Sequence, residues 1–363
     1  MNRVSLTLPV EATTFSQILL TWYRVQKRDL PWRESLDPYR IWLSEIMLQQ
    51  TRVQTVVPYF ERFVGAYPTL EHLAHADEEE VLDLWSGLGY YGRARNLHKT
   101  AKLIKEEHGG EFPEEYAEVV RLPGIGPYSA AAILSIAFGQ THAVLDGNVR
   151  RVLARYLAIR EEVKGPVERS LKSCLAEIAG SVHAIGRIGD FNQALMELGA
   201  LVCTPKDPRC VECPLKESCR AFSEALQGEL PKQRKKPATQ EIHLTVAVVE
   251  RASRYLMCRN TAGTYLRGLW EFPKLNGWPA KEVLTALFSK THGLEILPLE
   301  ICEPVIHHVT FRKLMFRPVK AALAVEPQDG PFRWVRFGEK PYPVSSYIPK
   351  IITLAGRTPS AGH

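Results

Sequence analysis

The sequence predicts a multidomain chain in which an all-α domain is followed by an α+β domain. Apolar residues recur at helical spacing from about residue 12 to about residue 225. A polar, basic, proline-bounded stretch follows, and beyond it β-branched residues alternate along strand-like segments. We therefore expect an all-α domain over 1–226, a linker over 227–240, an α+β domain over 241–355 and a disordered tail over 356–363.

The first helices are predicted by apolar side chains three and four positions apart, as in Phe15, Ile18, Leu19 and Trp22. The same spacing recurs over 41–46 and 56–63. Proline-containing turns at 35–38 and 66–69 separate these segments. Short turns between amphipathic helices indicate a compact helical domain.

Composition excludes several classes of protein. Charged residues make up 24% and hydrophobic residues 45%, which is ordinary for a globular protein. The net charge of +6 is compatible with a polyanionic partner without requiring one. We find no signal peptide and no run of about 18 apolar residues that would span a membrane.

A hairpin between two helices is predicted at Leu122-Pro123-Gly124-Ile125-Gly126-Pro127-Tyr128. Gly124 and Gly126 can adopt backbone angles closed to other residues and leave their amides uncovered. Amides at a hairpin and at a helix N-terminus form an anion site, and a DNA phosphate is the obvious anion.

Two carboxyl groups lie in contrasting environments. Asp146 begins a helix, where the helix dipole favours the ionised form. Glu45 lies in a mostly apolar helix, and burial there should raise its pKa and keep it protonated. A helix cap for Asp146 and a surface ion pair for Glu45 are the structural alternatives.

Four of the seven cysteines are spaced C-x6-C-x2-C-x5-C: Cys203, Cys210, Cys213 and Cys219. Four thiolates in one loop suit an iron–sulfur cluster or a structural zinc ion. Only Cys210 and Cys213 form a close pair, and longer intervals separate this pair from Cys203 and Cys219. This spacing favours one [4Fe-4S] cluster over a zinc ion. The odd count argues against a disulfide framework.

Beyond the linker, strands are predicted over 242–249, 255–258, 303–309, 314–316 and 333–335, and a helix over 281–290.

The hairpin, the acidic turn Leu145-Asp146-Gly147-Asn148 and the cysteine spacing together resemble the helix–hairpin–helix DNA glycosylases related to endonuclease III. Within them the chain is similar to adenine DNA glycosylases (the MutY family), on the segments 29–33, 42–51 and 87–91. The resemblance implies a base excision repair enzyme that flips adenine out of a mispair with 8-oxoguanine or guanine and hydrolyses its N-glycosidic bond. It implies double-stranded DNA as partner, a monomer, and a cytoplasmic, nucleoid-associated bacterial protein.

The resemblance also implies roles for the two carboxyl groups. Glu45 would protonate adenine N7, and ionised Asp146 would stabilise or capture the sugar cation. Tyr128 stands where glycosylase/lyase relatives carry a Schiff-base lysine, and a phenol cannot form an imine. A monofunctional glycosylase is therefore expected, with Tyr128 bonded to Asp146 or the sugar. The alternative is an endonuclease III-type glycosylase/lyase acting on oxidised pyrimidines.

Further site residues follow from the resemblance alone. Gln50 and Tyr90 would act as wedge and stacking partner for the duplex opened by base flipping. Leu48 and Thr51 would lie near the lesion or the adenine. The remaining residues assigned to DNA or to the active site are Arg28, Arg33 and Asn148.

The segment 268–273 resembles the Nudix-like domain of adenine DNA glycosylases. The stretch 274–283 lacks the dense glutamates of a Nudix hydrolase, so we expect a lesion-recognition module without pyrophosphatase activity. Thr310 keeps the hydroxyl of the family's lesion-reading motif, but Phe311 replaces its histidine and cannot donate a hydrogen bond. The alternative for Phe311 is a strand core residue.

Overall fold

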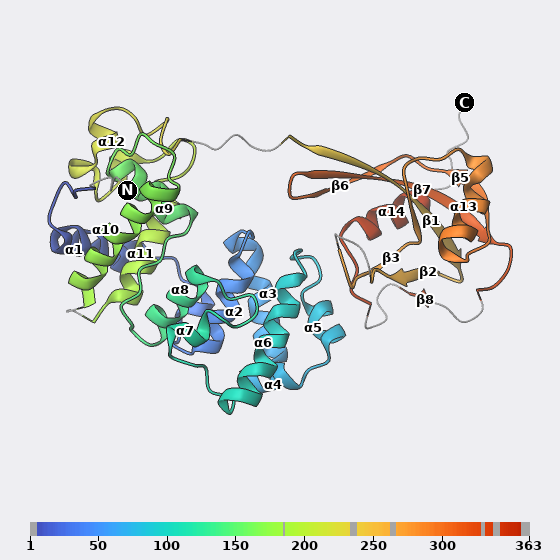
Figure 1. Cartoon of the computed structure of the whole chain (residues 1–363), viewed down its shortest axis with the longest axis horizontal. Coiled ribbons are helices and arrows are strands. Elements are labelled where there is room, and N and C mark those ends of the chain that lie inside the picture. Colours follow the sequence, from blue (N-terminus) through green and yellow to red (C-terminus); the bar gives the residue numbers. More distant parts are fainter. Residues whose placement is uncertain are drawn as a thin grey trace. The chain divides into compact units, whose positions relative to one another are not determined.

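The computed structural model describes residues 6–183, 186–232, 238–261, 266–327, 331–336 and 342–356. The chain divides into two compact units (Figure 1). The helical unit comprises Met1–His75 and Asn96–Lys235, and the sheet unit comprises Ala76–Arg95 and Lys236–His363. The segment Ala76–Arg95 thus associates with the sheet unit, where the Tyr91 hydroxyl donates to the Val344 carbonyl at 2.9 Å.

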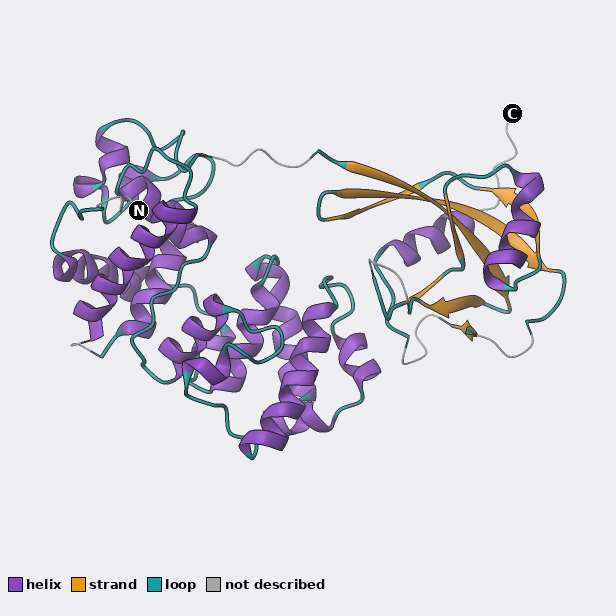
Figure 2. Ribbon diagram, viewed as in Figure 1, coloured by secondary structure: helices purple, strands orange, loops and turns teal. Residues whose placement is uncertain are grey.

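The described part of the helical unit contains no strands, as predicted (Figure 2). Its core is formed by α1, α8, α9, α10 and α11, with Phe15 and Leu19 of α1 fully buried against Phe191 of α11. The elements up to the cysteine-rich loop are α1 (Ala12–Gln26), η1 (Pro31–Arg33), α2 (Pro38–Leu48), α3 (Val53–Ala66), α4 (Leu70–His75), α6 (Gly92–His108, entering from the sheet unit), α7 (Tyr116–Val119), α8 (Pro127–Ala137), α9 (Gly147–Tyr156), α10 (Gly165–His183) and α11 (Ile188–Leu201).

The cysteine-rich loop ends the helical unit. It contains η2 (Cys210–Glu212) and η3 (Lys216–Ser218) and is followed by the short helix α12 (Arg220–Ser223). The start of the predicted linker is folded back on these elements, because Leu230 is buried and its amide donates to the Leu226 carbonyl at 3.1 Å. Residues 233–237 of that linker lie outside the described residues.

The sheet unit is built on an eight-stranded mixed sheet with the central order β3-β2-β1-β7-β5. The long strands β1 and β7 are parallel, with Leu244 opposite Phe316. β4 pairs with β1, β6 with β7 and β8 with β2. The strands are β1 (Gln240–Arg251), β2 (Arg254–Arg259), β3 (Trp270–Glu271), β4 (Lys274–Asn276), β5 (Ile296–Ile301), β6 (Val305–Val309), β7 (Arg312–Leu323) and β8 (Phe332–Val335).

One helix packs on each face of this sheet. Because side chains alternate along β1, Val246 and Val248 face the core built with α14 (Tyr347–Ala355), and Ala247 and Val249 face the core built with α13 (Leu284–His292). The helix predicted over 281–290 begins as η4 (Lys281–Val283) and continues as α13. The α5 helix (Glu78–Leu84) also belongs to this unit. The α+β prediction is confirmed.

The sequence reading missed β3, β4, β5 and α14. In β5 only Ile296 is fully buried, whereas Leu297, Leu299 and Ile301 are exposed. An edge strand with apolar residues on its exposed face does not show the polar–apolar alternation on which the prediction relied. Residues 357–363 of the predicted tail lie outside the described residues.

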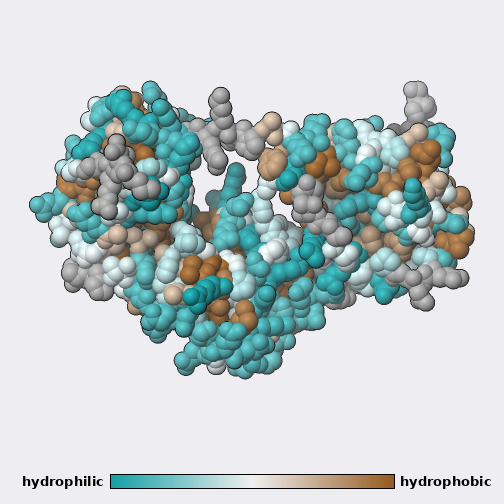
Figure 3. Space-filling view, in the orientation of Figure 1, coloured by the Kyte–Doolittle hydropathy of each residue, from teal (hydrophilic) through white to brown (hydrophobic). Residues whose placement is uncertain are grey.

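Hydrophilic residues cover most of the visible face of the helical unit, and hydrophobic colour is confined to smaller patches (Figure 3). Among the described residues, no helix is both long enough and apolar enough to cross a membrane.

Candidate active site

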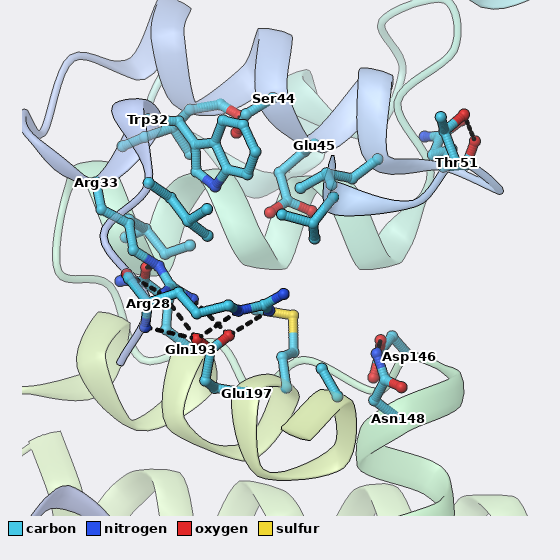
Figure 4. Close-up of a pocket in the computed structure, with 18 of the residues that line it drawn as sticks. Arg28, Trp32, Arg33, Ser44, Glu45, Thr51, Asp146, Asn148, Gln193 and Glu197 are labelled. Atoms are coloured by element: carbon cyan, nitrogen blue, oxygen red, sulfur yellow. Dashed lines mark hydrogen bonds and ion pairs between the residues drawn. The ribbon is translucent and has the colours of Figure 1, made fainter. Parts of the chain in front are cut away.

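A cavity of about 320 Å³ opens within the helical unit between α2, the start of α8, the start of α9 and α11. Figure 4 shows Glu45, Asp146 and Glu197 reaching it from three different elements. Its lining includes most residues that the sequence assigned to the site: Arg28, Arg33, Glu45, Leu48, Gln50, Thr51, Tyr128, Asp146 and Asn148. Segments more than 150 residues apart thus supply one site, as the Arg28–Glu197 contact shows.

Glu45 lies one turn before the end of α2, whose start is fixed by Pro38 and by Asp37, which accepts a hydrogen bond from the Tyr39 amide at 2.9 Å. The residues around Glu45 in α2 are buried, and Glu45 itself is only 7% exposed. Burial raises the pKa of Glu45 to about 7, and the nearby charge of Asp146 adds to this rise, whereas a hydrogen bond with Tyr128 opposes it. The predicted rise of this pKa is therefore found.

Asp146 is the N-cap of α9. Its Oδ1 accepts from the Val149 amide at 2.7 Å, and its Oδ2 accepts from Asn148 Nδ2 at 3.0 Å. Burial nevertheless raises the pKa of Asp146, and these hydrogen bonds only limit the rise. The amides at the helix start favour the ionised form, as expected, but removal of water has the larger effect on this pKa.

Asn148 connects Asp146 to the rest of the fold. Its Oδ1 accepts from Arg151 Nη2 at 2.9 Å, and Arg151 Nε donates to the Cys203 carbonyl at 2.7 Å. A Cβ on Gly199 of α11 would lie 2.6 Å from Asn148 Cβ, so the glycine permits the close contact of α9 with α11. A continuous chain of hydrogen bonds therefore runs from Asp146 to the first cysteine of the cysteine-rich loop.

Tyr128 lies in the first turn of α8, directly behind the hairpin. Its hydroxyl donates a hydrogen bond to Met196 Sδ at 3.2 Å, and its interaction with Glu45 lowers the pKa of that carboxyl group. Burial, with the charges of Glu45 and Asp146, raises the pKa of Tyr128 well above its usual range, so the phenol stays protonated. Among the described residues no hydrogen bond joins Tyr128 to Asp146, and its bond to the sugar stays a prediction.

Glu197 is the main site residue that the sequence reading missed. It is 1% exposed on α11 and holds both Arg28 and Arg33, with Oε2 at 2.7 Å and 3.1 Å from their Nη2 atoms. Burial would raise the pKa of Glu197, but the hydrogen bonds from the two arginines outweigh it and hold this pKa at about 2. Glu197 is an acidic residue within the apolar run 194–198, and the same pattern, an acid in an apolar helix, identifies Glu45. This pattern is the sequence feature that indicates Glu197.

The hairpin is anchored by buried Leu122 and Ile125, and Thr100 donates to the Pro123 carbonyl at 2.9 Å. Gly124 has φ +80°, and a Cβ there would lie 2.7 Å from Asn96 Cβ. Gly126 is different, since its φ of −94° and ψ of 177° are open to any residue and no atom lies within 4 Å of an added Cβ. The expectation of special backbone angles at both glycines is thus confirmed only for Gly124.

This contrast gives a test of the hairpin as a phosphate site. Gly124→Ala should lower the free energy of unfolding by about 2 kcal/mol, because it combines strain with a clash. Gly126→Ala should leave stability within about 0.5 kcal/mol, yet weaken duplex binding severalfold by placing a methyl group over the exposed amides. Urea unfolding and fluorescence anisotropy measure the two effects, and equal DNA affinity in Gly126→Ala would argue against phosphate binding here.

All seven cysteines are free of disulfide bonds in this structure. Cys203, Cys210, Cys213 and Cys219 line one small cavity of about 30 Å³, together with Arg155 and Lys216. Burial raises the pKa of the Cys213 thiol to about 12. Within the described ranges, no three His, Cys, Asp or Glu side chains are arranged to hold a metal ion.

Tyr90 and Thr310 do not line the cavity around Glu45. They line a second cavity of about 580 Å³ within the sheet unit, together with Arg95, Arg267 and Arg312. Tyr90 and Thr310 both have positive φ, +51° and +56°, which is uncommon for bulky or β-branched residues.

Thr310 and Phe311 form the turn between β6 and β7. Phe311 is 40% exposed, and the Arg312 guanidinium lies 4.2 Å from the centre of its ring. The alternative that Phe311 is a strand core residue is therefore excluded.

The chain is similar in sequence to known DNA repair proteins. A model of the HhH-GPD superfamily of base excision DNA repair proteins matches residues 43–177. The adenine DNA glycosylase of Buchnera aphidicola (subspecies Schizaphis graminum) is 38% identical over 263 residues, 72% of this chain and 75% of that protein. The human adenine DNA glycosylase is 39% identical over 373 residues, 86% of this chain and 68% of that protein.

Among solved structures, a thermostable thymine-DNA glycosylase is similar to the chain with a TM-score of 0.52 and 28% sequence identity. The similarity covers 59% of this chain and 97% of that one. The superfamily match over 43–177 includes Glu45, Tyr128 and Asp146.

Proposed function

Since this chain belongs to the adenine DNA glycosylase family, we propose that it removes adenine mispaired with 8-oxoguanine or guanine in double-stranded DNA and leaves an abasic site. The observation that carries this proposal is the cavity that brings buried Glu45 and the capped carboxylate of Asp146 to one space. At about 320 Å³ it lies in the size range of pockets that enclose a small ligand, as an extruded base requires. We propose that the enzyme acts as a monomer.

The two carboxyl groups have different roles in the reaction, one as the acid and the other as the carboxylate that stabilises the sugar cation. Glu45, with a pKa of about 7, is protonated in part near neutral pH and donates its proton to adenine N7. The C1′–N9 bond breaks with its electron pair going to the base, and the carboxylate of Asp146 stabilises the sugar cation. Water then adds to C1′ and gives up a proton to the Glu45 carboxylate that the first proton transfer left behind. Tyr128, which lines the same cavity and lowers the pKa of Glu45, acts as a positioning residue for Glu45.

The cavity favours hydrolysis over lyase chemistry. No lysine is among the described residues that line it, and Tyr128 occupies the start of α8. Without an amine, no Schiff base with the sugar can form. The cavity therefore provides no support for the endonuclease III-type alternative.

Gln50 fits the role of a residue that enters the duplex. Gln50 follows α2, is exposed at the rim of the cavity, and has φ +59°. An exposed side chain held in a strained conformation beside the cavity can fill the space that the extruded adenine leaves.

We propose that Cys203, Cys210, Cys213 and Cys219 hold one [4Fe-4S] cluster. Their thiols line one small cavity, and the side chains of Arg155 and Lys216 beside them supply positive charge toward an anionic cluster. When bound, such a cluster would hold the two ends of the loop together through its four cysteine thiolates. Iron and sulfide analysis of the purified protein tests this cofactor, and zinc in place of iron would contradict it.

The cavity of the sheet unit is the candidate site for the 8-oxoguanine strand, with Tyr90 and Thr310 as contacts. Phe311→His should raise the preference for 8-oxoguanine:A over G:A about threefold to tenfold, because this factor corresponds to the free energy of one hydrogen bond. Single-turnover rates on the two duplexes measure this ratio. Phe311→Leu is the matched control because it removes the ring without adding a donor, and an equal ratio in the histidine variant would contradict the prediction.

Base release from duplexes containing 8-oxoguanine:A, G:A or an oxidised pyrimidine tests the proposed function. We expect free adenine from the first two duplexes, no release from the third, and no covalent adduct after borohydride treatment. Efficient trapping, or release of the oxidised pyrimidine, would overturn the proposal.

A further inference from the structure

Arg155 of α9 is one of the most deeply buried charged residues of the helical unit, with 3% of its surface exposed. Its guanidinium forms hydrogen bonds with two segments of the chain, the cysteine-rich loop and the segment that contains Leu230. It donates to the Thr204 carbonyl at 2.7 Å and the Pro205 carbonyl at 3.2 Å, and its Nη1 lies 3.4 Å from Cys203 Sγ. Its Nε donates to the Leu230 carbonyl at 2.8 Å.

Residues 226–230, here called the exit segment, follow α12 and lead out of the helical unit. The segment is ordered by its own hydrogen bonds, with the Leu226 amide donating to Ala221 at 2.7 Å. The hydrogen bond from Arg155 Nε to the Leu230 carbonyl connects the exit segment to α9. One guanidinium therefore joins α9, the cysteine-rich loop and the exit segment.

The charge of Arg155 is not matched by a carboxylate. Within the part of the chain that the structure describes, its acceptors are three carbonyl oxygens and a thiol, and no Asp or Glu forms an ion pair with it. A buried cation without a counter-charge is unfavourable. Four cysteine thiolates around a cluster would supply the missing negative charge directly beside it.

We propose that Arg155 is a positioning residue that couples occupancy of the cysteine site to the order of the exit segment. With the cysteines ionised on a cluster, the guanidinium is held at Cys203 and is fixed for its bond to Leu230. Without the cluster, the buried charge has no partner and that bond weakens. The inference rests on the proposed cluster, and because coupling is reciprocal, an ordered exit segment would also help to retain iron.

The test combines one substitution with iron removal in the full-length protein. Amide hydrogen exchange is followed in peptides covering 226–230, in wild type and in Arg155→Lys, each loaded with iron or depleted by a chelator. In wild type, depletion should speed exchange of the exit segment about tenfold. Loaded Arg155→Lys should exchange about as fast as depleted wild type, because lysine keeps the charge but lacks the planar fork.

The four proteins, wild type and variant with and without iron, form a thermodynamic cycle. This cycle distinguishes coupling between iron and the exit segment from a stabilising effect of Arg155 that does not depend on iron. In the depleted proteins the variant should differ from wild type by less than about twofold. An equally large effect of Arg155→Lys with and without iron would overturn the inference, as would exchange in wild type that does not respond to iron. If the lysine variant does not retain iron, Arg155→Gln takes its place in the cycle.

Arg160→Ala is the matched control. Arg160 lies four residues after α9 and forms an ion pair at 2.7 Å with Glu224, which directly follows α12, but it is exposed and does not line the cysteine cavity. This variant should keep the iron dependence of exchange. Absence of iron from wild-type protein would refute the proposed cluster itself, whereas bound iron with iron-independent exchange would refute only the coupling.

Discussion

Asp146→Asn should lower the rate of adenine release by about three orders of magnitude, roughly 4 kcal/mol of barrier, while duplex binding stays within a few-fold of wild type. Asparagine has no negative charge with which to stabilise the sugar cation. It is as good a helix N-cap as aspartate, so the bond from the Val149 amide at 2.7 Å can persist. Single-turnover base release and anisotropy measure the two quantities.

The control for this substitution is Asp37→Asn. Asp37 caps α2, the helix that carries Glu45, by the same kind of bond, but it lies outside the cavity. Both variants should lose about 1 kcal/mol of stability or less, and only Asp146→Asn should lose activity. Wild-type turnover in Asp146→Asn would defeat the assignment of Asp146.

Glu45→Gln should lower the rate of adenine release by about 10³-fold, because glutamine cannot transfer a proton to the base. In wild type the rate should fall as pH rises through about 7, where Glu45 loses its proton. The residual rate of Glu45→Gln should not show this fall. A single-turnover pH profile measures it, with the exposed Glu61 of α3, changed to glutamine, as control.

The same pKa predicts an effect on stability. The folded pKa of Glu45, about 7, lies above its ordinary value of 4.5, so the folded protein binds the proton more tightly than the unfolded chain. Wild-type stability should therefore fall relative to Glu45→Gln as pH rises from about 4.5 to about 7, by up to roughly 3 kcal/mol. Urea unfolding at several pH values measures this difference, and a pH-independent difference would show that Glu45 is not buried as an acid.

Local patterns predicted much of the fold. Helical periodicity identified the helical unit, and the cap at Asp146 was readable because Asp-Gly-Asn before an apolar-periodic run is a helix start. Alternation identified β1 because its two faces pack against α13 and α14. The association of Ala76–Arg95 with the sheet unit could not be predicted from local sequence patterns, because it depends on contacts between residues far apart in the chain, such as Tyr91 with Val344.

For the site, the sequence by itself determined which groups are available: a carboxyl in an apolar helix, a carboxyl at a helix start, a tyrosine in place of lysine, and four closely spaced cysteines. These are local properties of composition and spacing. Only the tertiary structure decided how the groups act on one another. It placed Glu197 between Arg28 and Arg33, raised the pKa of Asp146 through burial, and set buried Arg155 between Cys203 and Leu230. The physical reason is that burial and charge interactions depend on distance in space, which spacing along the chain does not specify.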